Sequence, residues 1–174
     1  MKQLLLICFI VGATLSSANA QVAPGACNMN HLQGQPALPE PARGRVKDIF
    51  AAAQEATASE IADGLITDRC TLMSLLVGKK ITGKFPAQGQ YPNDADEVHV
   101  FYPDGRFLKY VYPSSFAQGT YQIIVNGKVP VITWKVSGDF TMEGGYAFEV
   151  KNKQLIGFYR SQGRRQPLLI QGQP

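Results

Sequence analysis

The residues that could do chemistry are few and widely spaced. The chain has two histidines, His31 and His99, and no Cys/His spacing typical of a metal site. Ser114 and Ser115 lie near His99 in the sequence but lack the Gly-x-Ser-x-Gly motif of a serine hydrolase, so they are interpreted as turn residues. The sequence therefore predicts no metal site, no cofactor and no catalytic nucleophile.

Acid and base chemistry needs a histidine or a second carboxylate held close to the first group. One such arrangement stays open, in which His99 forms a proton-transfer pair with an acid such as Asp139. Asp94, Asp96 and Glu97 could together bind a hard cation, but the Asp-x-Asn-x-Asp-Gly register of a calcium loop is absent.

Aromatic side chains fall on consecutive predicted strands, and most of them are explained by ordinary core packing. An aromatic-lined concavity would also accept an apolar or amphipathic small molecule. Its expected lining is Tyr110, Tyr121 and Trp134, because these residues lie in the middle of neighbouring predicted strands.

The first twenty residues, 1–20, are typical of a secretory signal peptide. Lys2 gives a positive start, residues 4–15 are apolar, and Ala18-Asn19-Ala20 is an A-x-A cleavage site. The apolar run is too short for a transmembrane segment. We therefore expect a periplasmic or secreted protein, in which Cys27 and Cys70 form a disulfide; two buried thiols are the alternative.

The formal net charge of the whole chain is +4, which is mild. Lysine and arginine gather near the C-terminus, so a weakly basic edge could face anionic lipid headgroups or an acidic protein. Ordinary solubilising charge on strand edges is the simpler interpretation. The sequence has no long basic run and no aromatic residues interleaved with such a run, so it predicts no binding to nucleic acid.

The predicted domain organisation is a signal peptide at 1–20, an extended Pro/Gly-rich arm at 21–42, and one domain at 43–174. The domain begins with an amphipathic helix over 43–59. A second short helix is expected to start at the cap Thr67-Asp68 and to end at Gly78.

Seven or eight short strands are expected after the helices. Pro103-Asp104-Gly105 and Asn126-Gly127 are turn signals that join them into an antiparallel meander. Apolar residues on both faces of the first hairpin predict that both faces are covered. The predicted strands span 79–84, 98–102, 107–112, 119–125, 128–136, 146–151 and 154–160, with an edge strand at 168–170, and 86–96 is a long loop.

The entry strand Gly78-Lys79-Lys80-Ile81-Thr82-Gly83, the aromatic-Pro-Asp-Gly-Arg-Phe hairpin and the Gly-Thr-Tyr strand together resemble small exported bacterial proteins with a lipocalin-like, calycin-type β-meander. The resemblance covers 78–160. It implies a partly open barrel capped by one or two helices. The Gly-x-Trp of the first lipocalin strand is absent, and the single tryptophan is Trp134.

The closing hairpin at 148–160, which follows two helices and a curved sheet, is also similar to the α+β cone of nuclear transport factor 2-like folds. That resemblance implies either an enzyme or a binding module. An enzyme with this fold would use His99 and an acid as the proton-transfer pair.

We therefore expect an exported binding or interaction protein that is not an enzyme. An apolar small ligand would occupy the aromatic interior. A protein partner, such as a lysozyme or toxin held by an exported inhibitor, would contact the 86–96 loop and the strand edges. The alternative is the enzyme just described.

Overall fold

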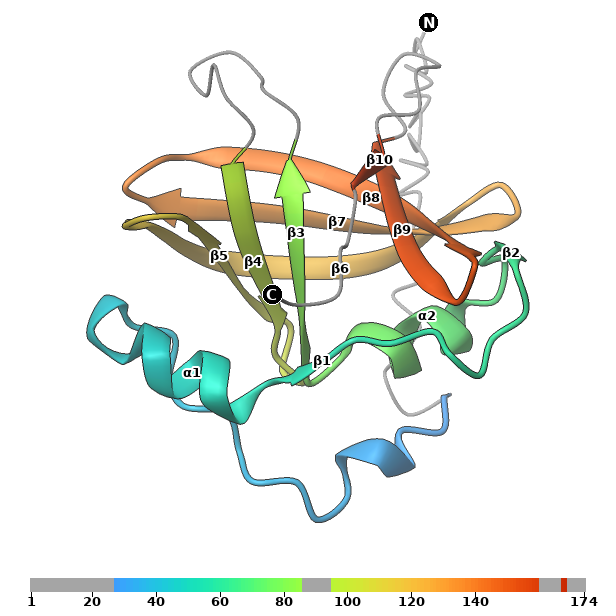
Figure 1. Cartoon of the computed structure of the whole chain (residues 1–174), viewed down its shortest axis with the longest axis horizontal. Coiled ribbons are helices and arrows are strands. Elements are labelled where there is room, and N and C mark those ends of the chain that lie inside the picture. The colour runs from blue at the N-terminus through green and yellow to red at the C-terminus, as the bar shows by residue number, and fades with distance from the viewer. Residues whose placement is uncertain (1–26, 86–94, 160–166, 169–174) are drawn as a thin grey trace, which may run out of the picture.

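The computed structural model describes residues 27–85, 95–159 and 167–168. A single ten-stranded sheet curls into an open half-barrel that two short α-helices accompany (Figure 1). The strand order is β1-β3-β4-β5-β6-β7-β8-β9-β10, and β2 pairs with β8 outside this path. Each strand from β3 to β9 is antiparallel to the next, so the predicted meander and helix-bearing partly open barrel are confirmed.

The helices are α1 (Val46–Ala52) and α2 (Arg69–Leu76), and 3-10 turns occupy Asn30–Leu32 and Arg43–Arg45. The strands are β1 (Gln54–Glu55), β2 (Gly64–Leu65), β3 (Lys79–Phe85), β4 (Ala95–Phe101), β5 (Arg106–Val111), β6 (Ser115–Asn126), β7 (Val129–Gly138), β8 (Met142–Lys151), β9 (Gln154–Tyr159) and β10 (Pro167–Leu168). No helix in the described ranges is long and apolar enough to cross a membrane.

The predicted turns are where the sequence places them. Gly105 and Gly127 have φ angles of 87° and 68°, which glycine adopts without a Cβ clash. Asn152 and Lys153 also have positive φ in the β8–β9 turn. Their backbone N–H groups donate to the Asp63 carboxylate at 2.9 and 3.4 Å, which holds this turn against the β2 region.

The first helix is much shorter than the predicted 43–59. After α1 ends, the chain turns to run parallel to β3 as β1. The Ala56 N–H donates to the Lys80 carbonyl at 2.8 Å, and the Glu55 carboxylate accepts from the Thr82 N–H at 2.8 Å. These bonds to β3 outweigh the helix propensity of the alanines, which is only a few tenths of a kcal/mol per residue.

The second helix agrees with its prediction. The Asp68 side chain accepts from the Thr71 N–H at 2.6 Å, which is an N-cap bond. After the helix, Gly78 has a φ of 78° and donates its N–H to Phe101 at 2.7 Å. The disulfide between Cys27 and Cys70 is also confirmed. It ties the arm to α2 across 43 positions of sequence, which stabilises a fold of this kind by about 2–4 kcal/mol.

Several predicted strand limits differ from the structure. β6 begins at Ser115 and β8 at Met142, so both are longer than predicted, and Ser115 belongs to a strand rather than a turn. Ala95 and Asp96 belong to β4 rather than to the long loop. The rest of that loop (86–94), the signal peptide, arm residues 21–26 and the basic residues at 160–165 lie outside the described residues.

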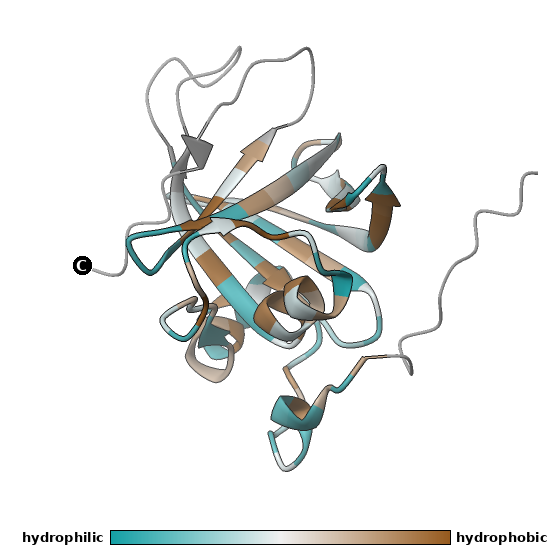
Figure 2. Ribbon diagram, turned by 90° about the vertical axis from the view of Figure 1, so that its right-hand side faces the viewer, coloured by the Kyte–Doolittle hydropathy of each residue, from teal (hydrophilic) through white to brown (hydrophobic). Residues whose placement is uncertain are grey.

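The sheet has two apolar faces, as predicted. Helix α1 packs its buried Ile49 on the outer face of β4, β5 and β6, against Val100 and Leu108. Helix α2 packs Leu72 and Leu76 into the concave side, where the larger core lies. Successive residues of a strand point to opposite faces, so β4 and β5 contribute buried side chains to both clusters. Figure 2 shows hydrophobic and hydrophilic residues distributed along the strands.

Candidate functional site

A buried cluster of three ionisable side chains lies on the concave side of the sheet. Glu97 and His99 belong to β4 and Lys109 to β5, and they are only 3%, 2% and 2% exposed. Glu97 and His99 share a face because they are two residues apart on a strand. His99 and Lys109 are directly opposite each other in the register, which brings all three side chains together.

One carboxylate oxygen joins the three groups. Oε2 of Glu97 lies 2.9 Å from Nζ of Lys109 and 3.0 Å from Nε2 of His99. The Lys109 ammonium also lies 3.6 Å from Sδ of Met142 and 5.0 Å from the centre of the Trp134 ring, a cation–π distance. The positive charge is therefore held between a carboxylate and an aromatic face.

Aromatic rings enclose the histidine. The His99 ring stacks on Tyr146 at 5.7 Å between centroids and meets Phe107 edge-on at 5.3 Å. Trp134 lies 6.2 Å away on a further side. Phe107 and Tyr146 are themselves within 6 Å of Trp134, so the rings form one packed group around the ion cluster.

The pKa values in the cluster follow from this burial. Burial lowers the pKa of His99, although its hydrogen bond to Glu97 acts in the opposite direction. Burial also lowers the pKa of Lys109, which the charge of Glu97 partly offsets. For Glu97, burial acts to raise the pKa, but the bond from His99 and the charge of Lys109 together hold it below its ordinary range.

These shifts predict acid-sensitive stability. Unfolded His99 takes up a proton near its usual pKa of 6.5, but folded His99 does so only at lower pH. The stability that depends on neutral His99 is therefore complete above pH 6.5 and is lost below it, with a slope of up to about 1.4 kcal/mol per pH unit. The loss from Glu97 begins lower, as pH falls through its usual pKa of 4.5.

The measurement is the free energy of unfolding between pH 8 and pH 5, taken by urea denaturation at roughly one-unit steps. His99→Gln should flatten the curve below pH 6.5, and the control His31→Gln, which lies outside the cluster, should not. Equal slopes in the wild type and in His99→Gln would contradict the burial of a neutral histidine.

The acid named as an example of a partner for His99 is Asp139, whereas the structure places Glu97 beside His99. Asp139 lies at the surface, where it pairs with Arg43 and accepts a hydrogen bond from the Phe116 N–H at 2.8 Å. A spacing of two residues along a strand was the sequence signal that could have identified Glu97. His31 lies elsewhere, with Nε2 2.9 Å from the Val77 carbonyl oxygen.

The three residues expected to line a ligand cavity do not share one face. Tyr121 and Trp134 are cross-strand partners in the concave core and are 9% and 3% exposed. Tyr110 lies on the outer face, where its ring meets Phe50 of α1 at 5.6 Å and Tyr112 at 5.2 Å. Lys109 takes the inward position beside it, so Tyr110 must point the other way.

Trp134 is the residue on which much of this core depends. Its ring lies over Gly144, where a Cβ atom would come within 2.7 Å of the indole. The indole nitrogen Nε1 is buried and has no hydrogen-bond partner among the described residues. Trp134 therefore contributes to the core by packing and by its contact with Lys109.

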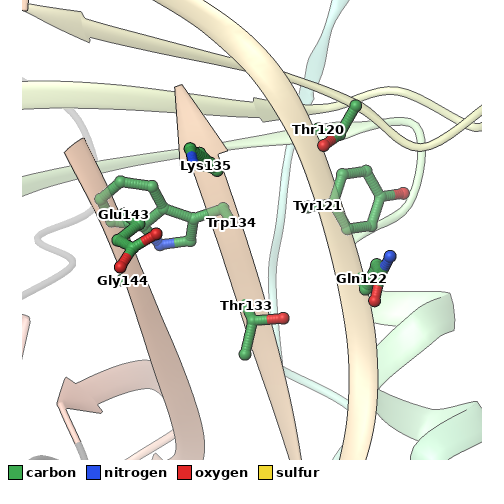
Figure 3. A pocket seen from close by; sticks show the side chains of 8 residues that line it. All are labelled: Thr120, Tyr121, Gln122, Thr133, Trp134, Lys135, Glu143 and Gly144. Carbon is green, nitrogen blue, oxygen red and sulfur yellow. The ribbon is translucent and has the colours of Figure 1, made fainter. Parts of the chain in front are cut away.

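A second feature is an open hollow of about 540 Å³ that lies across the middle of β6 and β7 and the beginning of β8 (Figure 3). Its outward-facing side chains alternate along the strands with the buried Tyr121 and Trp134. The lining residues are Thr120, Tyr121, Gln122, Thr133, Trp134, Lys135, Glu143 and Gly144. The outward side chains are polar, and Lys135 and Glu143 are directly opposite each other in the register.

Within the ranges that the structure describes, no three His, Cys, Asp or Glu side chains are grouped so that they could hold a metal ion. Comparison with known proteins assigns no family, because no family model, curated protein or solved structure matches the chain. The lipocalin-like and nuclear transport factor 2-like resemblances therefore stay predictions.

Proposed function

We propose that this chain is an exported binding protein that recognises another protein through the outer face of β6, β7 and β8, and that it performs no chemistry of its own. The observation that carries the proposal is the filled interior. Tyr121 and Trp134, the two inward-facing residues expected to hold an apolar ligand, both pack against Phe107, and Trp134 also lies against Lys109 of the buried cluster.

A small apolar ligand is the less favoured occupant. Tyr121 donates its hydroxyl to the Tyr102 carbonyl at 2.8 Å, and its ring contacts Phe101 at 5.4 Å. A molecule entering beside Trp134 would have to separate these rings and approach a buried ion pair. Desolvated charges next to an apolar ligand are unfavourable unless they remain fully paired.

The outer hollow suits a polypeptide. Three hydrogen-bonded strands hold it, so little conformational entropy is lost there on binding. It offers hydroxyl, amide and charged groups, which is the composition of the polar part of a protein interface. The disulfide between Cys27 and Cys70 supports an oxidising compartment, in agreement with the predicted signal peptide.

The test uses the protein purified from its own host. Native mass spectrometry before and after denaturation is expected to find a second protein bound at a fixed ratio. Thr133→Arg should abolish that complex, because it places a long charged side chain in the hollow. Ser137→Arg is the matched control on the same outward face of β7, outside the hollow, and should keep the complex.

Two results would oppose the proposal. A released mass of lipid size would favour the apolar ligand instead. A complex that survives Thr133→Arg would place the contact elsewhere on the surface.

The enzyme is the second candidate, because His99 faces the interior and does have an acid partner at 3.0 Å. Its substrate would have to displace the rings that enclose His99. If the chain were such an enzyme, a substrate analogue would quench the fluorescence of Trp134, the single tryptophan, and His99→Gln would remove this response.

A further inference from the structure

The far ends of β6 and β7 form a two-stranded ribbon that neighbouring strands do not flank. β5 pairs with β6 only as far as Thr120, and β8 pairs with β7 only from Ile132 onward. Beyond these points both edges of the ribbon are unpaired, within the part of the chain that the structure describes. Ile124 and Val125 on this ribbon are 43% and 57% exposed.

The direction of the backbone groups on the β6 edge follows from one hydrogen bond. The Tyr121 N–H donates to Gly105 at 2.9 Å, so it points away from β7. Backbone groups on alternate residues of a strand point to the same side. Ile123 and Val125 therefore present their N–H and C=O groups along the same edge, and no described residue bonds to them there.

The other edge of the ribbon is protected. Pro130 is paired with Val125, whose backbone groups point outward, so the nitrogen of Pro130 also points outward, toward the edge of β7. Proline has no N–H to offer a further strand, and natural sheets use it in this way to block edge pairing. The β6 edge carries no such block.

We propose that a second copy of this chain pairs with the β6 edge, antiparallel and about a two-fold axis at Ile124. This register places Ile123 opposite Val125 of the other copy, so the outward N–H and C=O groups of each meet their counterparts. Ile124 then faces Ile124 across the axis in a pair without hydrogen bonds, where side chains are closest.

The sequence of the edge fits self-pairing. Residues 122–126 (Gln-Ile-Ile-Val-Asn) carry no charge, so two identical strands do not repel each other. The β4–β5 turn lies beside Tyr121, at one end of the free edge, and it carries Asp104, an exposed carboxylate that Arg106 Nε contacts at 2.6 Å. In this register it receives the β6–β7 turn of the other copy, which carries Lys128, so the approaching charge is opposite in sign to the carboxylate and like charges do not meet there. The attraction is small because Arg106 already pairs with Asp104.

The contact is short, so the dimer should be weak. A few strand residues bury less surface than a standard interface, and a dissociation constant of about 10 μM to 1 mM is expected. The paired ribbons would form one continuous sheet, and both outer hollows would lie on the same side of it. The dimer does not depend on the proposed protein partner, since the β6 edge is a different surface from the hollow.

The test is sedimentation over a wide range of protein concentration. The wild type should shift from monomer to dimer as its concentration rises. Ile124→Lys and Ile124→Glu should each stay monomeric, because like charges would meet at the axis, and an equal mixture of the two should dimerise. Gln118→Lys is the matched control, exposed on the same face of β6 where β5 covers the edge, and it should dimerise as the wild type does.

Hydrogen exchange tests the wild type without a substitution. The Ile123 and Val125 amides should become protected as the protein is concentrated, and the Tyr121 amide, already bonded to Gly105, should not change. A wild type that stays monomeric, or an Ile124→Lys variant that dimerises as well as the wild type, would overturn the proposal. If the β6 edge pairs with a strand of another protein instead, the purified chain would stay monomeric in the sedimentation experiment, which would also overturn the proposal.

Discussion

Replacing Glu97 with glutamine is expected to lower the free energy of unfolding by about 3–5 kcal/mol, because removal of one partner leaves the other charge of a buried pair uncompensated. Lys109 is 2% exposed, so it has no access to water in place of the carboxylate. The glutamine amide keeps one oxygen but no charge, so His99 and Lys109 would share a neutral and weaker acceptor. The measurement is urea denaturation at pH 7, followed by circular dichroism.

The double variant Glu97→Gln/Lys109→Met distinguishes the cost of leaving one buried charge unpaired from the cost of losing the whole ion pair. Removing both charges should recover most of the lost stability, because an apolar side chain of similar volume needs no partner. Glu40→Gln is the surface control: Glu40 pairs with Arg106 but is well exposed, and exposed pairs typically contribute less than about 1 kcal/mol. If Glu97→Gln lowered the free energy of unfolding no more than Glu40→Gln does, that result would contradict the buried ion pair.

Replacing Trp134 with alanine is expected to cost about 3–5 kcal/mol, which is typical of a buried aromatic ring removed from a core. The ring touches Phe107, Tyr146 and Lys109, and it fills the space that Gly144 leaves. Its indole nitrogen makes no hydrogen bond to a described residue, so the loss comes from packing and from the cation–π contact.

Trp134→Phe is the matched variant, since it keeps a ring at the same position, and it should cost clearly less than alanine. Tyr112→Ala removes a half-exposed ring and should have little effect. Denaturation followed by circular dichroism measures all three, because tryptophan fluorescence is lost with the single tryptophan. An effect of Trp134→Ala below about 1 kcal/mol would place the ring outside the core.

The features that could be predicted from the sequence are mostly local. Gly105 and Gly127 determine two turns because glycine accepts a positive φ, and Asp68 begins α2 because its side chain reaches the N–H of Thr71. The mainly β meander with helices followed from these turns and from the apolar alternation between them. The disulfide followed from two cysteines and the predicted signal peptide.

Other features depended on contacts between distant parts of the chain. The alanine-rich segment after α1 leaves the helix because Glu55 and Ala56 find hydrogen-bond partners on β3. The face on which Tyr110 lies depends on the pairing of β5 with β4 and β6, and a shift of one residue would exchange its place with Lys109.

By itself, the sequence determined where the chain turns and that both faces of its sheet are apolar, because turn conformation and alternation are properties of neighbouring residues. Only the tertiary structure decided that Glu97, His99 and Lys109 share one carboxylate oxygen inside the barrel. The physical reason is that a buried charge is tolerated only beside a partner, and the pairing of β4 with β5 is what brings Lys109 next to Glu97 and His99.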